Sequence, residues 1–286
     1  MTTHEQQMQH LPRALTIAGS DSGAGAGIQA DLKTFAALQV YGLSAITAIT
    51  AQNTQGVRAA FPLAPELIEA QIDAVLEDIG ADAAKTGMLA SPEIIEAVAR
   101  CVTRWQVPLV VDPVMVAKGG DRLLAPAAIA TLRDVLIPLA TVVTPNLPEA
   151  EVLTGLRIET LTDMRRAAEA IAQLGAQHVV VKGGHSSGNP VDVYFDGEQF
   201  VELPAERIVT QHTHGTGCTF SAAITALLAR GLPVDRAVTG AKMYITGAIT
   251  YAPGIGHGHG PVEHFWQWKQ IQQKVSLQET KEGQIQ

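Results

Sequence analysis

Short apolar segments alternate along the chain with longer segments in which apolar residues recur every three or four positions. The first such unit joins an apolar run at residues 14–18 to a helical pattern at residues 28–40 through a glycine-rich turn. Alternation of short, buried strands with helical segments predicts a mainly parallel sheet that is covered by helices on both faces. Further apolar runs of this kind occupy residues 43–50, 81–86, 109–111, 141–144 and 178–182.

The pattern changes in the last third of the chain. Two strand-like segments, residues 191–195 and 199–203, flank the dipeptide Asp196-Gly197, which favours the tight turn of a β-hairpin. The sheet is therefore expected to end in an antiparallel edge hairpin. Two alanine-rich helices are expected to follow, at residues 218–230 and 233–251.

The organisation that we predict is a single domain, a three-layer α/β/α sandwich at residues 13–270. The sequence has no visible internal repeat and no proline- or glycine-rich stretch long enough to serve as an interdomain linker. The polar start of the chain, residues 1–12, and its end, residues 271–286, are expected to be flexible.

Composition narrows the class of protein. The chain has 286 residues, of which 47% are hydrophobic and 17% are charged, and its net charge of -8 argues against a broad nucleic-acid surface. The chain shows no apolar run of a signal peptide or a membrane span, so we expect a cytoplasmic protein. The two cysteines, Cys101 and Cys218, form no disulfide framework or zinc motif, and Cys101 continues a helical apolar stripe that is typical of a core position.

A glycine-rich loop at residues 18–27 lies between the first strand and the first helix. Its glycines allow a ligand to approach the backbone closely, at a point where helix N–H groups face outward. The spacing fits neither the dinucleotide-binding fingerprint nor the Walker A motif, which excludes a Rossmann-type oxidoreductase and a P-loop enzyme. A binding loop and a tight structural turn both remain consistent with this segment.

The segment HGTGC, residues 214–218, directly precedes an alanine-rich helix. Successive backbone N–H groups at a helix N-terminus converge on an anion, so Gly215, Thr216 and Gly217 are predicted to stabilise a phosphoryl group during its transfer. Cys218 lies at the same helix end, where the dipole should lower the pKa of its thiol and favour a role as general base. The alternative is a small buried cysteine at a helix start.

With these motifs in place, the chain closely resembles the bacterial hydroxymethylpyrimidine/phosphomethylpyrimidine kinases of the ribokinase-like superfamily over roughly residues 13–267. The resemblance implies a ribokinase-like fold, ATP and Mg²⁺. It also implies phosphorylation of 4-amino-5-hydroxymethyl-2-methylpyrimidine and then of its monophosphate, for thiamin biosynthesis. The motifs that carry it are LTIAGSDSGAGAGIQADLKTF, ITAQNTQGV, KTGML, VDPVM, TPNLPEAEVL, VKGGH, THGTGCTFSAAI and GIGHGHGPVEHF.

The resemblance also implies roles for individual residues. Gln52 is expected to pair with the edge of the aminopyrimidine, because an amide both donates and accepts hydrogen bonds; a polar residue that merely ends a strand is the alternative. Lys182 and Lys242 are expected near the nucleotide, although either could be a solvated lysine. Further substrate contacts are expected from Gly19, Asp31, Met88 and Val114.

Three residues are associated with the metal by the same resemblance. Asn146 and Glu149 form the pattern N-x-x-E, which helps to place Mg²⁺ and its waters near the phosphates. By spacing alone they could equally be a helix cap and an exposed acid. Asp112 ends a buried strand, where α/β sheets bind ligands, so it could meet Mg²⁺ or the substrate, or cap the next turn.

Some questions stay open at this stage. The first loop has Gly23-Ala24 where relatives usually carry Ser-Gly or Gly-Gly, and residues 52–62 are predicted to form a mobile flap. Cys218 occurs in related pyridoxal kinases too, so a pyridoxal kinase is the nearest alternative, and Gln52 argues against it. A sensor that binds ligand without turnover is a second alternative. The family commonly forms dimers, which predicts a homodimer.

Overall fold

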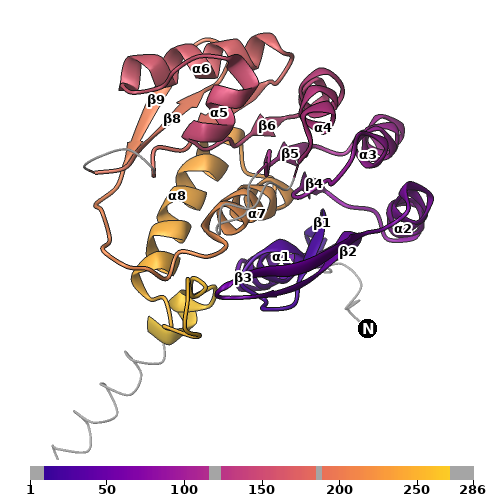
Figure 1. Ribbon diagram of the computed structural model, residues 1–286, viewed down its shortest axis with the longest axis horizontal. Helices are drawn as coiled ribbons and strands as arrows, with labels where there is room; N and C mark the ends of the chain where they lie inside the picture. Colours follow the sequence, from indigo (N-terminus) through magenta and orange to yellow (C-terminus); the bar gives the residue numbers. More distant parts are fainter. Residues whose placement is uncertain (1–9, 116–123, 185–188, 271–286) are drawn as a thin grey trace, which may run out of the picture.

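The computed structural model describes residues 10–115, 124–184 and 189–270. Within these residues the strands form one nine-stranded sheet in the order β3-β2-β1-β4-β5-β6-β7-β8-β9 (Figure 1). The six strands from β2 to β7 in this order are parallel to their neighbours, whereas β3 at one edge and β8 and β9 at the other are antiparallel. The mainly parallel sheet with an antiparallel edge hairpin is therefore confirmed.

Most strands lie where the sequence predicted apolar runs. A run at residues 109–111 is a strand over the same residues, and the hairpin turn at Asp196-Gly197 joins two antiparallel strands. The strands are β1 (Arg13–Asp21), β2 (Tyr41–Asn53), β3 (Gly56–Pro62), β4 (Ala83–Thr86), β5 (Leu109–Val111), β6 (Val142–Val143), β7 (His178–Val181), β8 (Val191–Phe195) and β9 (Phe200–Pro204).

Helices cover both faces of the sheet. Among the described residues, none of them is long and apolar enough to cross a bilayer. The predicted flexible ends of the chain fall almost entirely on residues 1–9 and 271–286, which lie outside the described residues. The α-helices labelled in Figure 1 are α1 (Gly27–Ala37), α2 (Pro65–Asp78), α3 (Pro92–Trp105), α4 (Pro126–Thr131), α5 (Leu147–Thr154), α6 (Leu161–Gln173), α7 (Thr216–Ala229) and α8 (Val234–Thr250).

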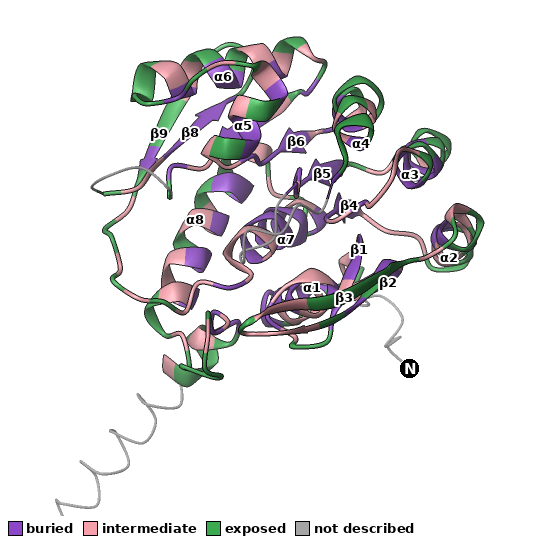
Figure 2. Ribbon diagram, in the orientation of Figure 1, coloured by how far each residue is buried: buried purple, intermediate pink, exposed green. Residues whose placement is uncertain are grey.

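Two apolar cores lie on opposite faces of the sheet. Apolar residues of α2, α3, α5 and α6 pack in one core, and those of α1, α7 and α8 pack in the other. Neighbouring strand residues point to opposite faces, so Val110 enters the second core while Leu109 and Val111 enter the first. Both sides of the central strands are therefore buried (Figure 2), which explains why these strands are apolar runs rather than alternating patterns.

Helix α3 illustrates how the sequence sets these boundaries. Pro92 occupies the first turn, where a missing N–H group costs nothing, and the Ser91 side chain accepts a hydrogen bond from the Ile94 backbone. The helix ends where Gln106 adopts the left-handed conformation at φ 53°. Cys101 lies in the buried stripe between these ends, so its predicted core position is confirmed.

Strand β3 differs from the expectation. We predicted a mobile flap at residues 52–62, but residues 56–62 form an edge strand whose residues pair with β2. The turn before it is held as well, because the His259 backbone N–H donates to the Thr54 carbonyl oxygen at 2.8 Å. An ordered hairpin therefore occupies the region for which we predicted a mobile flap, and its movement on ligand binding remains a prediction.

Candidate active site

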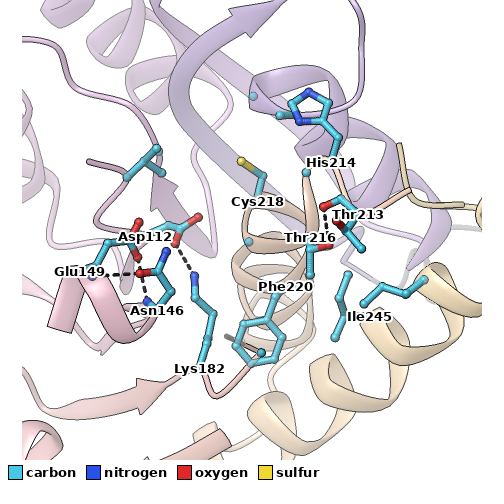
Figure 3. Close-up of a pocket in the computed structure, with 18 of the residues that line it drawn as sticks. Asp112, Asn146, Glu149, Lys182, Thr213, His214, Thr216, Cys218, Phe220 and Ile245 are labelled. Carbon is cyan, nitrogen blue, oxygen red and sulfur yellow. Dashed lines mark hydrogen bonds and ion pairs between the residues drawn. The ribbon is translucent and has the colours of Figure 1, made fainter. Parts of the chain in front are cut away.

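A cavity of about 760 Å³ opens along the carboxyl edge of the parallel strands. Asp112 directly follows β5, Asn146 lies three residues after β6, and Lys182 directly follows β7. The carboxyl ends of parallel strands lie at one edge of a sheet, so these three side chains enter the same cavity (Figure 3). The start of α7, with Cys218, lines the same cavity beside them, because a Cβ atom on Gly217 would lie 3.3 Å from Lys182 Nζ.

The cavity brings together nearly all of the residues that the sequence singled out. Met88 and Val114 lie in the loops after β4 and β5, and Gln52 lies near the end of β2. Of the predicted site residues, those that line the cavity are Gly19, Gln52, Met88, Asp112, Val114, Asn146, Glu149, Lys182, Gly215, Thr216, Gly217, Cys218 and Lys242.

Asp31 is the exception, and its predicted contact with the substrate is wrong for this structure. Its carboxylate has no exposed surface and does not line the cavity. It accepts hydrogen bonds from Lys85 Nζ at 2.7 Å and from Thr16 Oγ1 at 2.6 Å. The sequence reasoning missed Lys85, whose buried ammonium group keeps this carboxylate inside the protein.

The HGTGC segment forms the start of α7, as the sequence predicts. Gly215 has a φ of 77°, and a Cβ atom there would lie 1.8 Å from the carbonyl oxygen of Gly25. Only glycine allows this close approach of the two glycine-containing loops. The first-turn N–H groups of a helix have no acceptor within the helix, so Gly217 and Cys218 present donors of the kind that bind phosphate.

The expected lowering of the Cys218 pKa is wrong for the ligand-free protein. Burial raises the pKa of this thiol to about 11, and the carboxylates of Asp31 and Asp112 add to the increase. The positive charge of Lys85 opposes the increase without cancelling it. Cys218 lines the cavity, but the surrounding protein excludes water from its thiol. This desolvation raises the pKa more than the positive end of the helix dipole lowers it. The thiol is therefore protonated at neutral pH.

Asp112 and Lys182 form an ion pair at the sheet edge. Lys182 Nζ lies 3.0 Å from Asp112 Oδ1, and both side chains are largely buried. Burial alone would lower the pKa of Lys182, but the carboxylates of Asp112 and Glu149 together raise it. The lysine is therefore a fixed cation in the cavity and not the solvated side chain that was the alternative.

Asn146 and Glu149 form a capping box at the start of α5. The Asn146 side chain accepts from the Glu149 backbone N–H at 2.9 Å, and Glu149 Oε2 accepts from the Asn146 backbone N–H at 2.8 Å. The helix-cap interpretation of Asn146 is therefore confirmed, whereas Glu149 is buried rather than exposed. Burial, assisted by the nearby Asp112, raises the pKa of Glu149 to about 7 although Lys182 opposes this.

The residues at this edge suit a loosely held magnesium ion. No group of three or more His, Cys, Asp or Glu side chains within the described ranges is arranged to hold a metal. Mg²⁺ at phosphate sites usually takes one or two carboxylates and completes its shell with water and phosphate oxygens. Asp112 and Glu149 offer such a pair of carboxylates in one cavity, so the donor set fits Mg²⁺ that arrives with a nucleotide.

Lys242 approaches the cavity from α8. Its Nζ atom lies 2.7 Å from Asp192 Oδ2, and Asp192 Oδ1 accepts from the Gly183 backbone N–H at 2.8 Å. Both charged side chains are largely buried. This ion pair excludes the solvent-facing alternative and positions a second lysine on the cavity wall.

Asp21 and His214 organise the glycine-rich loop, and the sequence analysis assigned neither of them a role. Asp21 accepts hydrogen bonds from the backbone N–H groups of Gly23, Gly25 and Ala26 at 2.8–3.0 Å. His214 Nε2 lies 2.9 Å from Asp21 Oδ2. Burial alone would raise the pKa of Asp21, but these hydrogen bonds hold it below its usual value. The carboxylate of Asp21 therefore fixes the backbone of the loop through these hydrogen bonds.

Ala24 in this loop has the left-handed φ of 59°. The left-handed conformation destabilises an L-residue by about 1–2 kcal/mol. Glycine adopts it without strain, although its greater freedom in the unfolded chain lowers the free energy of unfolding by about 0.4–1 kcal/mol. We therefore expect Ala24→Gly to raise the free energy of unfolding, by up to about 1 kcal/mol, in a denaturant titration. Ala36→Gly, on the exposed face of α1, is the matched control and should lower it by about 1 kcal/mol. Equal losses in both variants would contradict the strain at Ala24.

Comparison with known proteins identifies the family. A model of the family described as phosphomethylpyrimidine kinase matches residues 21–263. The hydroxymethylpyrimidine/phosphomethylpyrimidine kinase of Rhizobium meliloti is 55% identical over 259 residues, which are 89% of this chain and 97% of that protein.

Solved structures agree with the fold class expected from the sequence. Phosphomethylpyrimidine kinase from Clostridium difficile aligns with a TM-score of 0.75 and 49% identity over 83% of this chain and 99% of that one. The ADP complex of Bacillus subtilis pyridoxal kinase aligns with a TM-score of 0.84 and 47% identity over 89% and 97%. The chain whose cavity is described above belongs to the phosphomethylpyrimidine kinase family.

Proposed function

We propose that this protein transfers the γ-phosphoryl group of ATP to 4-amino-5-hydroxymethyl-2-methylpyrimidine. A second transfer to the monophosphate gives the diphosphate that serves thiamin biosynthesis. The observation that carries the proposal is the joint cavity. Gln52, the HGTGC helix start and the Asp112–Lys182 pair line one space at the carboxyl edge of the sheet. The names of the family and of the Rhizobium meliloti relative support the same substrate.

The side chains have distinct roles in this proposal. The thiolate form of Cys218 accepts the proton of the substrate hydroxyl. The turn Gly215-Thr216-Gly217 stabilises the charge that spreads over the transferring group through first-turn N–H groups such as that of Gly217. Lys182, whose Nζ atom lies next to Gly217, neutralises phosphate charge. Lys242 contributes a second positive charge on the nucleotide side.

Magnesium is part of the same proposal. Asp112 and Glu149 would hold the ion, and Asn146 would position Glu149 through the capping box. Bound Mg²⁺ supplies charge neutralisation between the phosphates. The carboxylates themselves also keep Lys182 protonated, since they raise its pKa.

Phosphorus NMR tests the function directly. Purified protein with Mg²⁺ and ATP should convert the pyrimidine first into a monophosphate and then into a diphosphate, with one ADP formed at each step. The diphosphate resonance should appear only after the monophosphate accumulates. Product that stops at the monophosphate would remove the second transfer from the proposal. A lack of any phosphorylated pyrimidine would refute the proposal and favour a ligand sensor.

Pyridoxal phosphorylation is the second candidate, because a pyridoxal kinase structure resembles this chain closely. Both substrates are six-membered nitrogen heterocycles that bear a hydroxymethyl group, and Cys218 suits either. Gln52 favours the pyrimidine, since its amide pairs with adjacent donor and acceptor groups. The ratio of the two activities therefore tests Gln52 as the residue that sets specificity.

A homodimer also belongs to the proposal. Phe61 of β3 and Ile49 of β2 are cross-strand partners whose exposed fractions are 70% and 53%, so an apolar pair faces outward at the sheet edge. Such residues suit an interface between two copies of the chain. Phe61→Glu should shift the mass measured by light scattering from dimer to monomer; an unchanged mass would exclude this edge from the interface. The cytoplasmic location expected from the sequence stays a prediction, which cell fractionation would test.

A further inference from the structure

The imidazole of His214 lies between a carboxylate and an amide at the cavity wall. Its Nε2 atom is 2.9 Å from Asp21 Oδ2 and 3.3 Å from the terminal amide of Gln52. His214 is buried, and all three residues line the cavity. Figure 3 shows the ring of His214 near the N-terminal end of α7, on the same side of the cavity as Cys218. The imidazole therefore connects the glycine-rich loop to the side-chain amide of Gln52, which is proposed to bind the substrate.

Asp21 determines which nitrogen of His214 carries hydrogen. An ionised carboxylate can only accept hydrogen bonds, and Asp21 already accepts from three backbone N–H groups. The short contact to Nε2 is attractive only if that nitrogen carries hydrogen. The ring therefore presents a donor, and not an acceptor, to the neighbouring amide of Gln52.

This donor selects one of two orientations of the Gln52 amide. With its nitrogen beside His214, two N–H donors face each other at 3.3 Å. Rotation of the amide by 180° leaves its shape unchanged and brings its oxygen to the imidazole N–H.

Thr50 favours the same rotation. Its hydroxyl hydrogen is used in the bond to the Ser20 carbonyl oxygen at 2.9 Å, so the Thr50 oxygen is free to accept. It lies 3.2 Å from the other end of the amide. A nitrogen at that end donates to Thr50, so both ends of the amide then face a suitable partner.

The orientation matters for substrate choice because it fixes the order of donor and acceptor along the free edge of the amide. The oxygen lies at the His214 end and the N–H at the Thr50 end. A 4-aminopyrimidine that binds with its amino group at the His214 end offers a donor to the amide oxygen and a ring-nitrogen acceptor to the amide N–H, which complements this order. The 4-oxo analogue offers an acceptor beside a ring N–H, which is the reverse.

We propose that His214 is a positioning residue that, held by Asp21, fixes the amide of Gln52 and thereby selects heterocycles that carry an amino group next to an unprotonated ring nitrogen. This inference rests on the proposed function, since it assumes that Gln52 meets the heterocycle. It assigns specificity to a residue that need not touch the substrate.

The test compares kcat/KM for the 4-aminopyrimidine with kcat/KM for its 4-oxo analogue. His214→Leu removes the stronger of the two constraints on the amide and leaves only the 3.2 Å contact with Thr50, so the ratio should fall by up to about tenfold, the discrimination that one bidentate amide pair provides. His214→Gln restores an N–H donor close to the position of Nε2 and should keep the ratio within about threefold of the wild type. His257→Gln, an exposed histidine outside the cavity lining, is the matched control and should leave the ratio unchanged.

The proposal would be overturned if the ratio of the two kcat/KM values were the same in the wild type and in His214→Leu. It would also be overturned if this ratio fell as far in His214→Gln as in His214→Leu. A second measurement does not depend on turnover or on the folding of the leucine variant. Long-range ¹H–¹⁵N correlation spectra of the ligand-free protein should show hydrogen on Nε2 of His214. The signals of this ring are assigned as those that disappear in the spectrum of His214→Gln. A ring with hydrogen on Nδ1 alone would also overturn the proposal.

These outcomes are separable from failure of the proposed function. If the wild-type protein phosphorylates neither pyrimidine, the function is wrong. The spectra still report the tautomer in that case, and binding of the two pyrimidines to wild type and His214→Leu, measured by calorimetry, replaces the kinetic ratio. If the wild type is active and discriminates but His214→Leu discriminates equally well, only the role of His214 fails.

Discussion

Replacement of Cys218 by alanine should lower kcat for pyrimidine phosphorylation about 10²- to 10⁴-fold, the contribution that a positioned general base usually makes. The side chain stands at the start of α7 within the cavity, next to the N–H groups expected to hold the transferring group. Binding of the nucleotide, measured by calorimetry, should change little because Cys218 is assigned to the hydroxyl of the substrate. Cys101→Ala is the matched control, since Cys101 is a buried residue of α3 and lies outside the cavity lining.

The raised pKa of Cys218 adds a pH dependence to this prediction. With a pKa of about 11 the thiol is protonated at pH 7, and the thiolate fraction grows by about tenfold for each pH unit below the pKa. The value of kcat/KM, which reports the free protein, should therefore rise between pH 7 and pH 9. Cys218→Ala should lose this rise in its residual activity. Near-normal turnover in Cys218→Ala, or a pH profile that is flat over this range, would contradict the general-base role.

Lys85→Met should lower the free energy of unfolding by about 3–5 kcal/mol, because it leaves the carboxylate of Asp31 buried without its charged partner. The two side chains form an ion pair at 2.7 Å and neither has any exposed surface. Urea titration followed by circular dichroism measures the loss. The double variant Lys85→Met, Asp31→Leu removes both charges and should recover much of the stability.

An exposed ion pair provides the comparison for this effect. Arg133 and Asp134 are neighbours on the surface and bond to each other, and Arg133→Met should change stability little because water screens exposed charges. A loss in Arg133→Met as large as in Lys85→Met would show that the method does not resolve buried pairing. A stable Lys85→Met protein would show that Asp31 has another partner or is neutral.

The central strands could be predicted because strands that are buried on both faces consist of apolar residues. Strands β5 and β6 lie between two helical layers, so they contain only apolar residues. Strand β3 lies at the sheet edge, and its residues Arg58, Ala59, Ala60 and Phe61 are exposed. Without an apolar face to bury, it carries no alternating pattern. A strand is therefore indistinguishable from a loop in this part of the sequence.

The site was predictable to the extent that its residues occur in contiguous motifs. HGTGC and the N-x-x-E pattern each lie at a helix start, where sequence position determines geometry. The bond between Asp21 and His214 joins residues 193 positions apart, and no local pattern connects them. The same holds for Asp31 on α1, whose partner Lys85 lies on β4. The Cys218 pKa was misjudged because its burial depends on several distant elements.

The most direct test of the proposed function measures ADP release with Mg-ATP and three acceptors at matched concentrations. These are 4-amino-5-hydroxymethyl-2-methylpyrimidine, its monophosphate and pyridoxal. We predict turnover of both pyrimidines with a higher kcat/KM than for pyridoxal, because the Gln52 amide complements the aminopyrimidine edge. A higher kcat/KM for pyridoxal would contradict the proposed function and would make the protein a pyridoxal kinase.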